Sequence, residues 1–175
     1  MTSQPLPESI LGLIRDVPDY PKPGVMFKDI TPLLDDAVAF QSVVTAIAAA
    51  AGDVTKVAGL EARGFLLAAP VALALGVGVV PVRKSGKLPS ETYAETYDLE
   101  YGTATIEIHR DALRPADRVL IVDDVLATGG TAAAAASLVR KSGAEVAGLS
   151  VLMELTFLGG RERLADLPVH SLVSV

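Results

Sequence analysis

Short runs rich in Val and Ile alternate along the chain with longer stretches whose apolar residues recur at helical spacing. Runs of the first kind predict buried strands, and stretches of the second kind predict helices. Strands are expected at 56–60, 77–83, 118–124, 145–155 and 170–175, and helices at 7–17, 35–52, 63–76, 129–143 and 159–167. Because strands and helices of these lengths alternate, we expect right-handed βαβ crossovers and an α/β fold whose mostly parallel sheet is covered on both faces.

Two segments depart from this alternation. Residues 20–34, YPKPGVMFKDITPLL, contain three prolines and a glycine and are expected to form an irregular surface segment. Residues 103–109 alternate between apolar and polar side chains, which predicts an antiparallel ribbon beside the main sheet. Caps predict the helix ends: Asp35 or Asp36 begins the second helix, Gly52 ends it, and Gly76 ends the third.

The composition fits a single domain spanning residues 1–175. Half of the residues are hydrophobic, 5% are aromatic and none is Trp, so the core has to be built mainly from Val, Leu, Ile and Ala. The absence of Cys excludes disulfides and thiolate metal sites. Residues 1–20 lack the pattern of a signal peptide, and no apolar stretch reaches the ~20 residues of a membrane span, so we expect a cytoplasmic protein with no membrane partner. The net charge of -6 argues against nucleic acid as a partner.

The stretch 119–131, VLIVDDVLATGGT, places two acids directly after a buried strand and follows them with a loop of small residues. In open α/β sheets, ligands bind at the carboxyl ends of strands. The loop amides can surround an anion, the helix that begins near Gly130 adds the positive end of its dipole, and two Thr hydroxyls add donors. The predicted phosphate cradle comprises Ala127, Thr128, Gly129, Gly130 and Thr131. It is neither a Walker A loop, since no Lys follows the glycines, nor a GxGxxG dinucleotide fingerprint.

Asp123 and Asp124 are the two acids. Carboxylates only accept hydrogen bonds, so the pair suits two vicinal sugar hydroxyls, and it can also hold Mg²⁺ directly or through water. The interpretation that we favour is ribose hydroxyls beside a 5′-phosphate. Two alternatives stay open, a strand-end acid pair of the response-regulator kind and a solvated charge pair, but the phosphate loop that follows directly argues against both.

This stretch resembles the phosphoribosyl-pyrophosphate (PRPP) binding motif of type I phosphoribosyltransferases. Four more segments resemble, in order and spacing, those of the adenine phosphoribosyltransferases: YPKPGVMFKDITPLL, EARGFLLAAPVALALG, PVRKSGKLP and YDLEYG. The resemblance covers roughly residues 17–165. It implies the type I phosphoribosyltransferase fold, with a flexible antiparallel lid near 84–109 and a small hood from about 17–34 and 155–175. It also implies purine salvage, in which adenine attacks the anomeric carbon of PRPP and gives AMP and pyrophosphate.

The resemblance implies a pyrophosphate site in two loops. The EARGF loop of the family often carries a non-proline cis peptide, which here would join Glu61 and Ala62, and its Arg63 supplies a planar fork of donors. The RKSGK run would clamp the departing charge, and Arg83 and Lys87 are the residues expected to make the contact. The implied residues are Glu61, Ala62, Arg63, Arg83, Lys84 and Lys87, of which Arg63 is also assigned a catalytic role. The alternatives from the residues alone are a surface arginine and a solvated basic run.

The resemblance also implies a base site and a catalytic acid. Phe27 would stack on adenine, the backbone at Val25 would bond the purine edge, and Leu155 would pack on the opposite face. Lys28 stands where many members have Arg, and it keeps the charge but loses the bidentate fork. The alternative is that Phe27 and Leu155 are ordinary core residues, and this alternative has more weight for Leu155.

In the implied lid, Glu100 is the catalytic glutamate, accepting a proton from the base or stabilising positive charge. Tyr101 would close over the site.

The implied cofactor is Mg²⁺ carried by PRPP near Asp123 and Asp124, without a direct protein cage. Neither His109 nor His170 has a partner at metal-ligand spacing. One basic residue of the RKSGK loop can reach the neighbouring subunit's site in the family, so a homodimer is expected. Two other functions remain: a transferase for another purine, against which VMFKDI argues, and a PRPP-sensing regulator that binds nucleic acid or protein.

Overall fold

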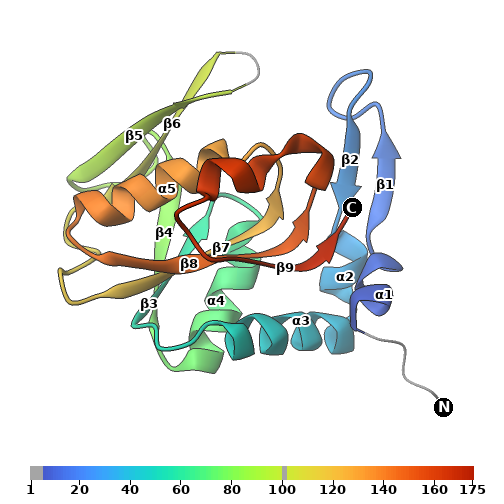
Figure 1. Cartoon of the computed structure of the whole chain (residues 1–175), viewed down its shortest axis with the longest axis horizontal. Coiled ribbons are helices and arrows are strands. Elements are labelled where there is room, and N and C mark those ends of the chain that lie inside the picture. The colour runs from blue at the N-terminus through green and yellow to red at the C-terminus, as the bar shows by residue number, and fades with distance from the viewer. Residues whose placement is uncertain (1–5, 100–101) are drawn as a thin grey trace.

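The computed structural model describes residues 6–99 and 102–175, so the predictions for Glu100 and Tyr101 fall outside the described residues. Its centre is a seven-stranded sheet in the order β5-β6-β4-β3-β7-β8-β9 (Figure 1). The strands are β3 (Lys56–Leu60), β4 (Gly78–Lys84), β5 (Thr92–Asp98), β6 (Thr103–His109), β7 (Arg118–Leu126), β8 (Glu145–Glu154) and β9 (Val169–Ser174). The five strands from β4 to β9 in this order are parallel, as the sequence predicts.

The expected antiparallel ribbon is the hairpin of β5 and β6. It is joined to the main sheet rather than separate from it, because the end of β4 pairs with β6 at Arg83 and Lys84. Figure 1 shows this ribbon extending beyond one end of the sheet while the paired strands β1 and β2 extend at the other. The carboxyl ends of β3 and β7 lie between these two projections.

Helices cover both faces of the sheet. On one face lie α5 (Gly130–Lys141) and the 3₁₀ turn η2 (Gly160–Leu164), and on the other lie α1 (Leu6–Leu11), α2 (Thr31–Asp35), α3 (Ala37–Ala50) and α4 (Gly64–Leu75). The strands divide their side chains between two cores, since Ile121 packs toward α5 and its neighbour Val122 toward α4. Both side chains are fully buried, and each such burial stabilises the fold by roughly 1.5–3 kcal/mol.

The predicted caps have their expected geometry. The Asp36 side chain accepts hydrogen bonds from the amides of Val38 and Ala39, so Asp36 is the residue that begins α3. Gly76 follows α4 in the left-handed conformation, with φ of 68°.

Three predictions of local structure are wrong. The first helix ends at Leu11, and Arg15–Pro18 forms β1, which pairs antiparallel with β2 (Met26–Asp29). The segment 20–34 is therefore not irregular, because it contains β2 and α2. The expected helix at 159–167 is replaced by η1 (Thr156–Leu158) and η2, because Gly159 between them has a φ of 63° that an α-helix cannot accommodate. No described helix is long and apolar enough to cross a membrane.

Candidate active site

The predicted site residues meet where β3 and β7 end and where α4 and α5 begin. A pocket of ≈ 400 Å³ opens there between the strand ends and the β5–β6 ribbon. Its lining includes Glu61, Ala62, Arg63, Lys84, Tyr97, Asp123, Asp124 and Thr131. A second pocket, formed by the loop 127–131, adjoins it, because Asp123 and Thr131 line both.

The loop 127–131 has the geometry of an anion site. Gly129 precedes α5 with a φ of 79°, a conformation that glycine adopts without steric cost. The amides of residues 128–131 donate to no acceptor in the described part of the chain. The hydrogen bond that begins α5 runs from the Ala133 amide to the Gly129 carbonyl. Unpaired amides at a helix N-terminus are a site for a phosphate oxygen, since the helix dipole adds its positive end there.

A glycine from another segment packs directly beneath this loop. A Cβ added to Gly160, at the start of η2, would lie 2.1 Å from the carbonyl oxygen of Ala127 and 3.0 Å from the amide nitrogen of Gly129. In the same way, a Cβ at Gly129 would lie 2.4 Å from the Gly160 carbonyl oxygen. The backbones of the loop and of η2 are therefore in contact, and only glycines permit this approach. The sequence signal for it was the pair of glycines at 159–160, which we interpreted only as a helix start.

The acid pair stands beside Arg63. Asp124 is 5% exposed, and its Oδ2 lies 2.8 Å from Arg63 Nε. The Arg63 Nε–H bond does not point at this oxygen, so the contact is an ion pair and not a hydrogen bond. Asp124 Oδ2 accepts no hydrogen bond from the described residues. Burial raises the pKa of Asp123 well above its ordinary value of 3.8, and the Asp124 carboxylate raises it further. Both acids line the pocket, where carboxylates can accept hydrogen bonds from the hydroxyls of a ligand.

Arg63 connects the acid pair to the small antiparallel sheet. Its Nη1 donates to the carbonyl oxygen of Lys28 at 3.0 Å, and its guanidinium carbon lies 4.7 Å from the centre of the Phe27 ring. The peptide between Glu61 and Ala62, just before it, is cis, as the resemblance implies. Gly64 lets α4 begin close to β7, since a Cβ there would be 2.8 Å from Asp123 Oδ1.

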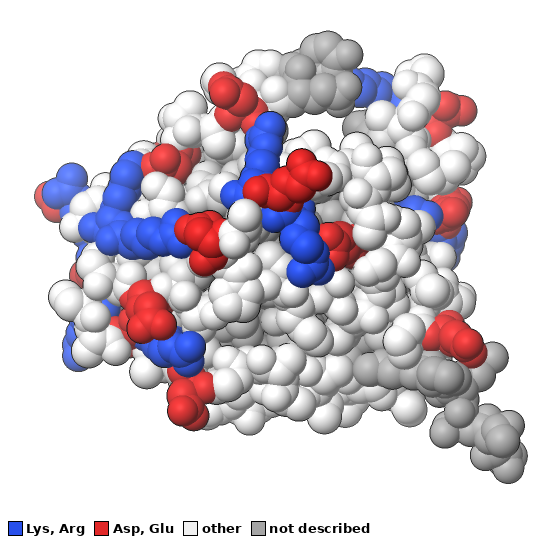
Figure 2. Space-filling model, in the orientation of Figure 1, with Lys and Arg blue, Asp and Glu red and all other residues white. Residues whose placement is uncertain are grey.

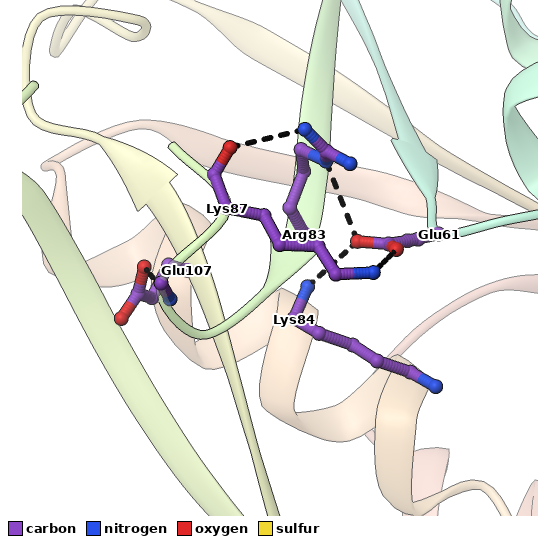
Figure 3. A network of polar contacts seen from close by, with 6 residues as sticks. Glu61, Arg83, Lys84, Lys87 and Glu107 are labelled. Carbon is purple, nitrogen blue, oxygen red and sulfur yellow. Dashed lines mark hydrogen bonds and ion pairs between the residues drawn. The ribbon is translucent and has the colours of Figure 1, made fainter. Parts of the chain in front are cut away.

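Glu61 gathers the basic run around a single carboxylate (Figure 3). Lys87 Nζ donates to Glu61 Oε1, the Lys84 amide donates to Oε2 at 2.9 Å, and Arg83 Nε lies 3.4 Å from the same oxygen. Burial raises the pKa of Glu61, but the hydrogen bonds from Lys87 and from the Lys84 amide outweigh it, so this pKa lies below its ordinary value of 4.5. Glu107 holds the turn that follows by accepting from Ser85 Oγ and the Gly86 amide.

The side chain of Lys84 differs from those of its neighbours. Figure 3 shows it pointing away from Glu61, and it lines the pocket together with Arg63. Its ammonium has no partner among residues 6–99 and 102–175, whereas Lys87 and Arg83 are both paired with Glu61. Of the three predicted cations, Lys84 is therefore the one placed in the pocket with its charge unpaired.

The predicted base segment lies on β2. Phe27 packs edge-on against Tyr20, with ring centres 5.1 Å apart, and its ring also contacts Arg63. The Lys28 ammonium is turned to β1, where it bonds Asp16 Oδ1 at 2.6 Å, so it does not point at Arg63 or the acid pair. The amide and carbonyl of Val25 are both engaged in the local turn, with Lys22 and Tyr20 respectively.

Leu155, the other predicted base contact, follows β8 and packs in part against the core beneath α4. Its amide bonds the carbonyl of Leu126 at 2.9 Å, which places it next to the strand that leads into the phosphate loop. Sequence reasoning missed Tyr97, whose hydroxyl accepts a hydrogen bond from Thr131. The signal was available, since Tyr97 begins the YDLEYG segment that otherwise supplies Glu100 and Tyr101.

Comparisons with known proteins agree with this arrangement. The model of the phosphoribosyl transferase domain matches residues 36–166. An adenine phosphoribosyltransferase from Thermobifida fusca is 61% identical over 164 residues, 93% of either chain. The crystal structure of adenine phosphoribosyltransferase from Thermoanaerobacter pseudethanolicus superposes with a TM-score of 0.95 at 51% identity, covering 98% of this chain and 100% of the other.

The Saccharomyces cerevisiae adenine phosphoribosyltransferase, solved with adenine and an imino-altritol bisphosphate, superposes with a TM-score of 0.90 at 40% identity and covers 95% of this chain and 98% of its own. The resemblance found in the sequence is thus confirmed, as is the α/β fold with its mostly parallel sheet. Because the domain model spans most of the chain and these relatives match nearly all of it, the chain belongs to the phosphoribosyltransferase family, among the adenine phosphoribosyltransferases.

Proposed function

We propose that the pocket between β3, β7 and the β5–β6 ribbon is where this chain transfers the 5-phosphoribosyl group of PRPP to adenine, the purine-salvage reaction that yields AMP and pyrophosphate. The observation that carries the assignment is the row of unpaired amides at 128–131 beside the buried acid pair. The amides and the hydroxyls of Thr128 and Thr131 hold the 5′-phosphate, and Asp123 and Asp124 accept the two ribose hydroxyls.

The pyrophosphate leaves toward the cations of the neighbouring loops. Arg63 and the unpaired Lys84 line the same pocket as the acid pair, so both can face the diphosphate without first breaking an ion pair to Glu61. Positive charge at the leaving group stabilises the negative charge that develops as the bond to the anomeric carbon breaks. Arg83 and Lys87 remain predicted contacts that would have to exchange Glu61 for the ligand.

Adenine is proposed to lie against Phe27, with the side chain of Leu155 and the backbone near Val25 completing its site. The Val25 amide would have to exchange the Lys22 carbonyl for the purine edge. Phe27 already carries a cation on one side, Arg63, which links the base site to the acid pair. The yeast relative was solved with adenine bound, which supports a base site in this fold. We also propose a lid near 84–109, in which Glu100 has the catalytic role and Tyr101 closes over the site. The proposed hood comprises about 17–34 and 155–175.

Mg²⁺ is the proposed cofactor. The residues that the structure describes contain no cluster of three His, Cys, Asp or Glu side chains, so the ion would take most of its ligands from PRPP oxygens and water. Asp123 and Asp124 line the pocket and could accept hydrogen bonds from the water of such a hydrated ion. When bound, Mg²⁺ neutralises diphosphate charge; the ribose and phosphate contacts are supplied by the protein.

A homodimer is proposed from the surface of α4. None of its twelve residues is charged, and a helix that is apolar all round is expected to be covered on all sides. Its inner face packs on the sheet, yet Leu66 is 49% exposed and Leu73 is 81% exposed. A second copy of the chain, related by two-fold symmetry, would cover this face.

We also propose a cytoplasmic location, which agrees with the absence of Cys.

Figure 2 shows Lys and Arg interspersed with Asp and Glu on the face that α5 occupies, so this face has no basic patch suited to nucleic acid.

The test of the proposed function is a spectrophotometric assay with PRPP, Mg²⁺ and one purine at a time. AMP formation from adenine alone is expected. Turnover of hypoxanthine or xanthine would identify another transferase, and no turnover of any base would favour the regulator.

A matched variant tests the ribose assignment. Asp124→Asn is expected to raise KM for PRPP strongly and to lower the free energy of unfolding only slightly. The side-chain amide replaces one acceptor oxygen with a donor, which a ribose hydroxyl cannot use in the same way. If the folded fraction of this variant binds PRPP normally, the acid pair does not hold the ribose.

A further inference from the structure

The hydroxyl of Tyr97 reaches the phosphate loop from the ribbon. Thr131 Oγ1 donates a hydrogen bond to the Tyr97 hydroxyl at 2.9 Å. The ring lies over the start of α5, because a Cβ added at Gly130 would be 3.2 Å from Tyr97 Cδ2. Tyr97 and Thr131 line the pocket that also contains the acid pair. The contact thus joins a strand of the ribbon to a loop residue whose proposed task is to bind phosphate.

Other contacts fix Tyr97 in this place. Side chains of β5 alternate between its two faces, so Tyr93, Glu95 and Tyr97 share the face toward α5. Lys141, in the last turn of α5, donates to the Glu95 carboxylate and to the carbonyl oxygen of Ala94. The hydrogen bond from Lys141 lowers the pKa of Glu95 below its ordinary value. The strand β5 is therefore attached near both ends of α5, through Lys141 at one end and Thr131 at the other, and Figure 1 shows the two elements lying together.

We propose that Tyr97 is a positioning residue whose hydroxyl holds the Thr131 side chain in the rotamer that presents Oγ1 to the 5′-phosphate. A hydroxyl can accept one hydrogen bond while it donates another. With phosphate bound, Tyr97 donates to Thr131 Oγ1, and Thr131 donates to a phosphate oxygen. Without Tyr97, the Thr131 hydroxyl is free to populate its other staggered positions. This inference rests on the proposed assignment of the loop 127–131 to the 5′-phosphate.

The test is Tyr97→Phe, which removes the hydroxyl and keeps the ring. KM for PRPP is expected to rise roughly three- to tenfold, the effect of one lost hydrogen bond, while kcat and KM for adenine stay nearly unchanged. Tyr93→Phe is the matched control. Tyr93 lies on the same face of β5 and stacks with Arg110, but its hydroxyl bonds none of the residues that the structure describes. Equal effects of the two variants on KM for PRPP would overturn the proposal.

A double-mutant cycle with Thr131→Val tests whether Tyr97 acts through Thr131. If it does, adding Tyr97→Phe to Thr131→Val raises KM for PRPP no further, whereas independent roles would give additive changes and would contradict the proposal. Calorimetric titration of each folded variant with AMP measures the same loss without turnover. If the unmutated protein makes no AMP from adenine, the proposed function fails; if it does and Tyr97 is indifferent, only the positioning role fails.

Discussion

At the scale of single residues, two carboxylates that are suited to ligand binding also affect the folding stability of the protein. Asp123 and Asp124 lie side by side with Arg63 as their nearby cation. Because the pKa of Asp123 is raised on folding, its ionised form is less favourable in the folded protein than in the unfolded chain. The penalty is absent below the ordinary pKa of 3.8, grows as the pH rises toward the folded pKa, and is complete above it.

Asp123→Asn is therefore expected to stabilise the free protein and weaken its substrate binding. At neutral pH its Tm should exceed that of the unmutated protein by a few degrees, while KM for PRPP increases. Calorimetric melting between pH 3 and neutrality, in buffers about one pH unit apart, checks the sign. The gain in Tm should shrink toward acid pH, and a gain that is constant with pH would show that the charge is not its cause.

Residue types could be predicted in the site, but their pairing could not. The basic run predicted Arg83, Lys84 and Lys87 as one cationic group, and they do lie together. The pairing of Arg83 and Lys87 with Glu61 depends on contacts between residues more than twenty positions apart, which neither spacing nor composition encodes. The same limit applies to Lys28, whose partner Asp16 lies on a strand that the sequence pattern did not predict.

At the scale of elements, the position of the phosphate loop depends on η2. The backbones of the two segments touch at Gly129 and Gly160, and η2 is in turn fastened to β8. Glu154, which is 6% exposed at the end of β8, accepts two hydrogen bonds from Arg161 and one from Ser171 on β9. The loop is thus supported by a chain of contacts that begins in the sheet.

Gly160→Ala is expected to displace the phosphate loop. Its Cβ would collide with the Ala127 carbonyl, which lies 2.1 Å away, so the loop must move. We expect KM for PRPP to rise about tenfold or more, because small misplacements of binding groups are costly. Gly159→Ala is the control, since its neighbours are no closer than 3.7 Å. It should lose roughly 1 kcal/mol of stability through its positive φ and keep its KM for PRPP.

Glu154→Gln tests the fastening of η2. The hydrogen bonds from Arg161, opposed by burial, lower the pKa of Glu154 below its ordinary 4.5, so the ion pair stabilises the fold above that pH. The variant should lose about 1 kcal/mol of unfolding free energy at neutral pH, a value that allows for the half-exposed Arg161. The deficit should vanish as the pH falls below 4.5 and through the folded pKa. Urea unfolding at several pH values measures it, and a deficit that persists in acid contradicts the ion pair as its source.

The elements with a strong periodic pattern could be predicted, and the weakly patterned ones could not. The parallel strands β3, β4, β7, β8 and β9 contain buried runs of Val, Leu and Ile, which identify them as strands. The pair β1–β2 has only four residues a strand and mostly exposed or half-buried side chains, so its pairing comes from tertiary contacts such as Arg63 to the Lys28 carbonyl. The contact of Gly129 with Gly160 is likewise set by the packing of α5 and η2, not by local propensity.

At the scale of the whole molecule, the uncharged helix α4 determines which surface is left to cover. Figure 2 shows a further uncharged area over α3, which packs beside α4 and also carries no charged residue. An exposed apolar area of this kind is typical of an interaction surface. Val79, near the start of β4, is also exposed.

Leu73→Glu is expected to convert a dimer into a monomer. The side chain is 81% exposed, so the substitution should change the stability of one chain by less than about 0.5 kcal/mol while burying a charge in the interface. Sedimentation velocity compares its mass with that of the unmutated protein. Leu158→Glu, at an exposed aliphatic position on η1 and outside both α3 and α4, serves as the control and should remain dimeric. A monomeric unmutated protein would contradict the proposed homodimer.

The distribution of the tyrosines has a spectroscopic consequence. The chain has four Tyr and no Trp, so tyrosine emission is not masked by indole. Tyr20 touches Phe27 on the small sheet, and Tyr97 touches the phosphate loop on the ribbon. Fluorescence excited in the near ultraviolet therefore includes a signal from the phosphate loop without any added dye, and the difference between the unmutated protein and Tyr97→Phe isolates that signal.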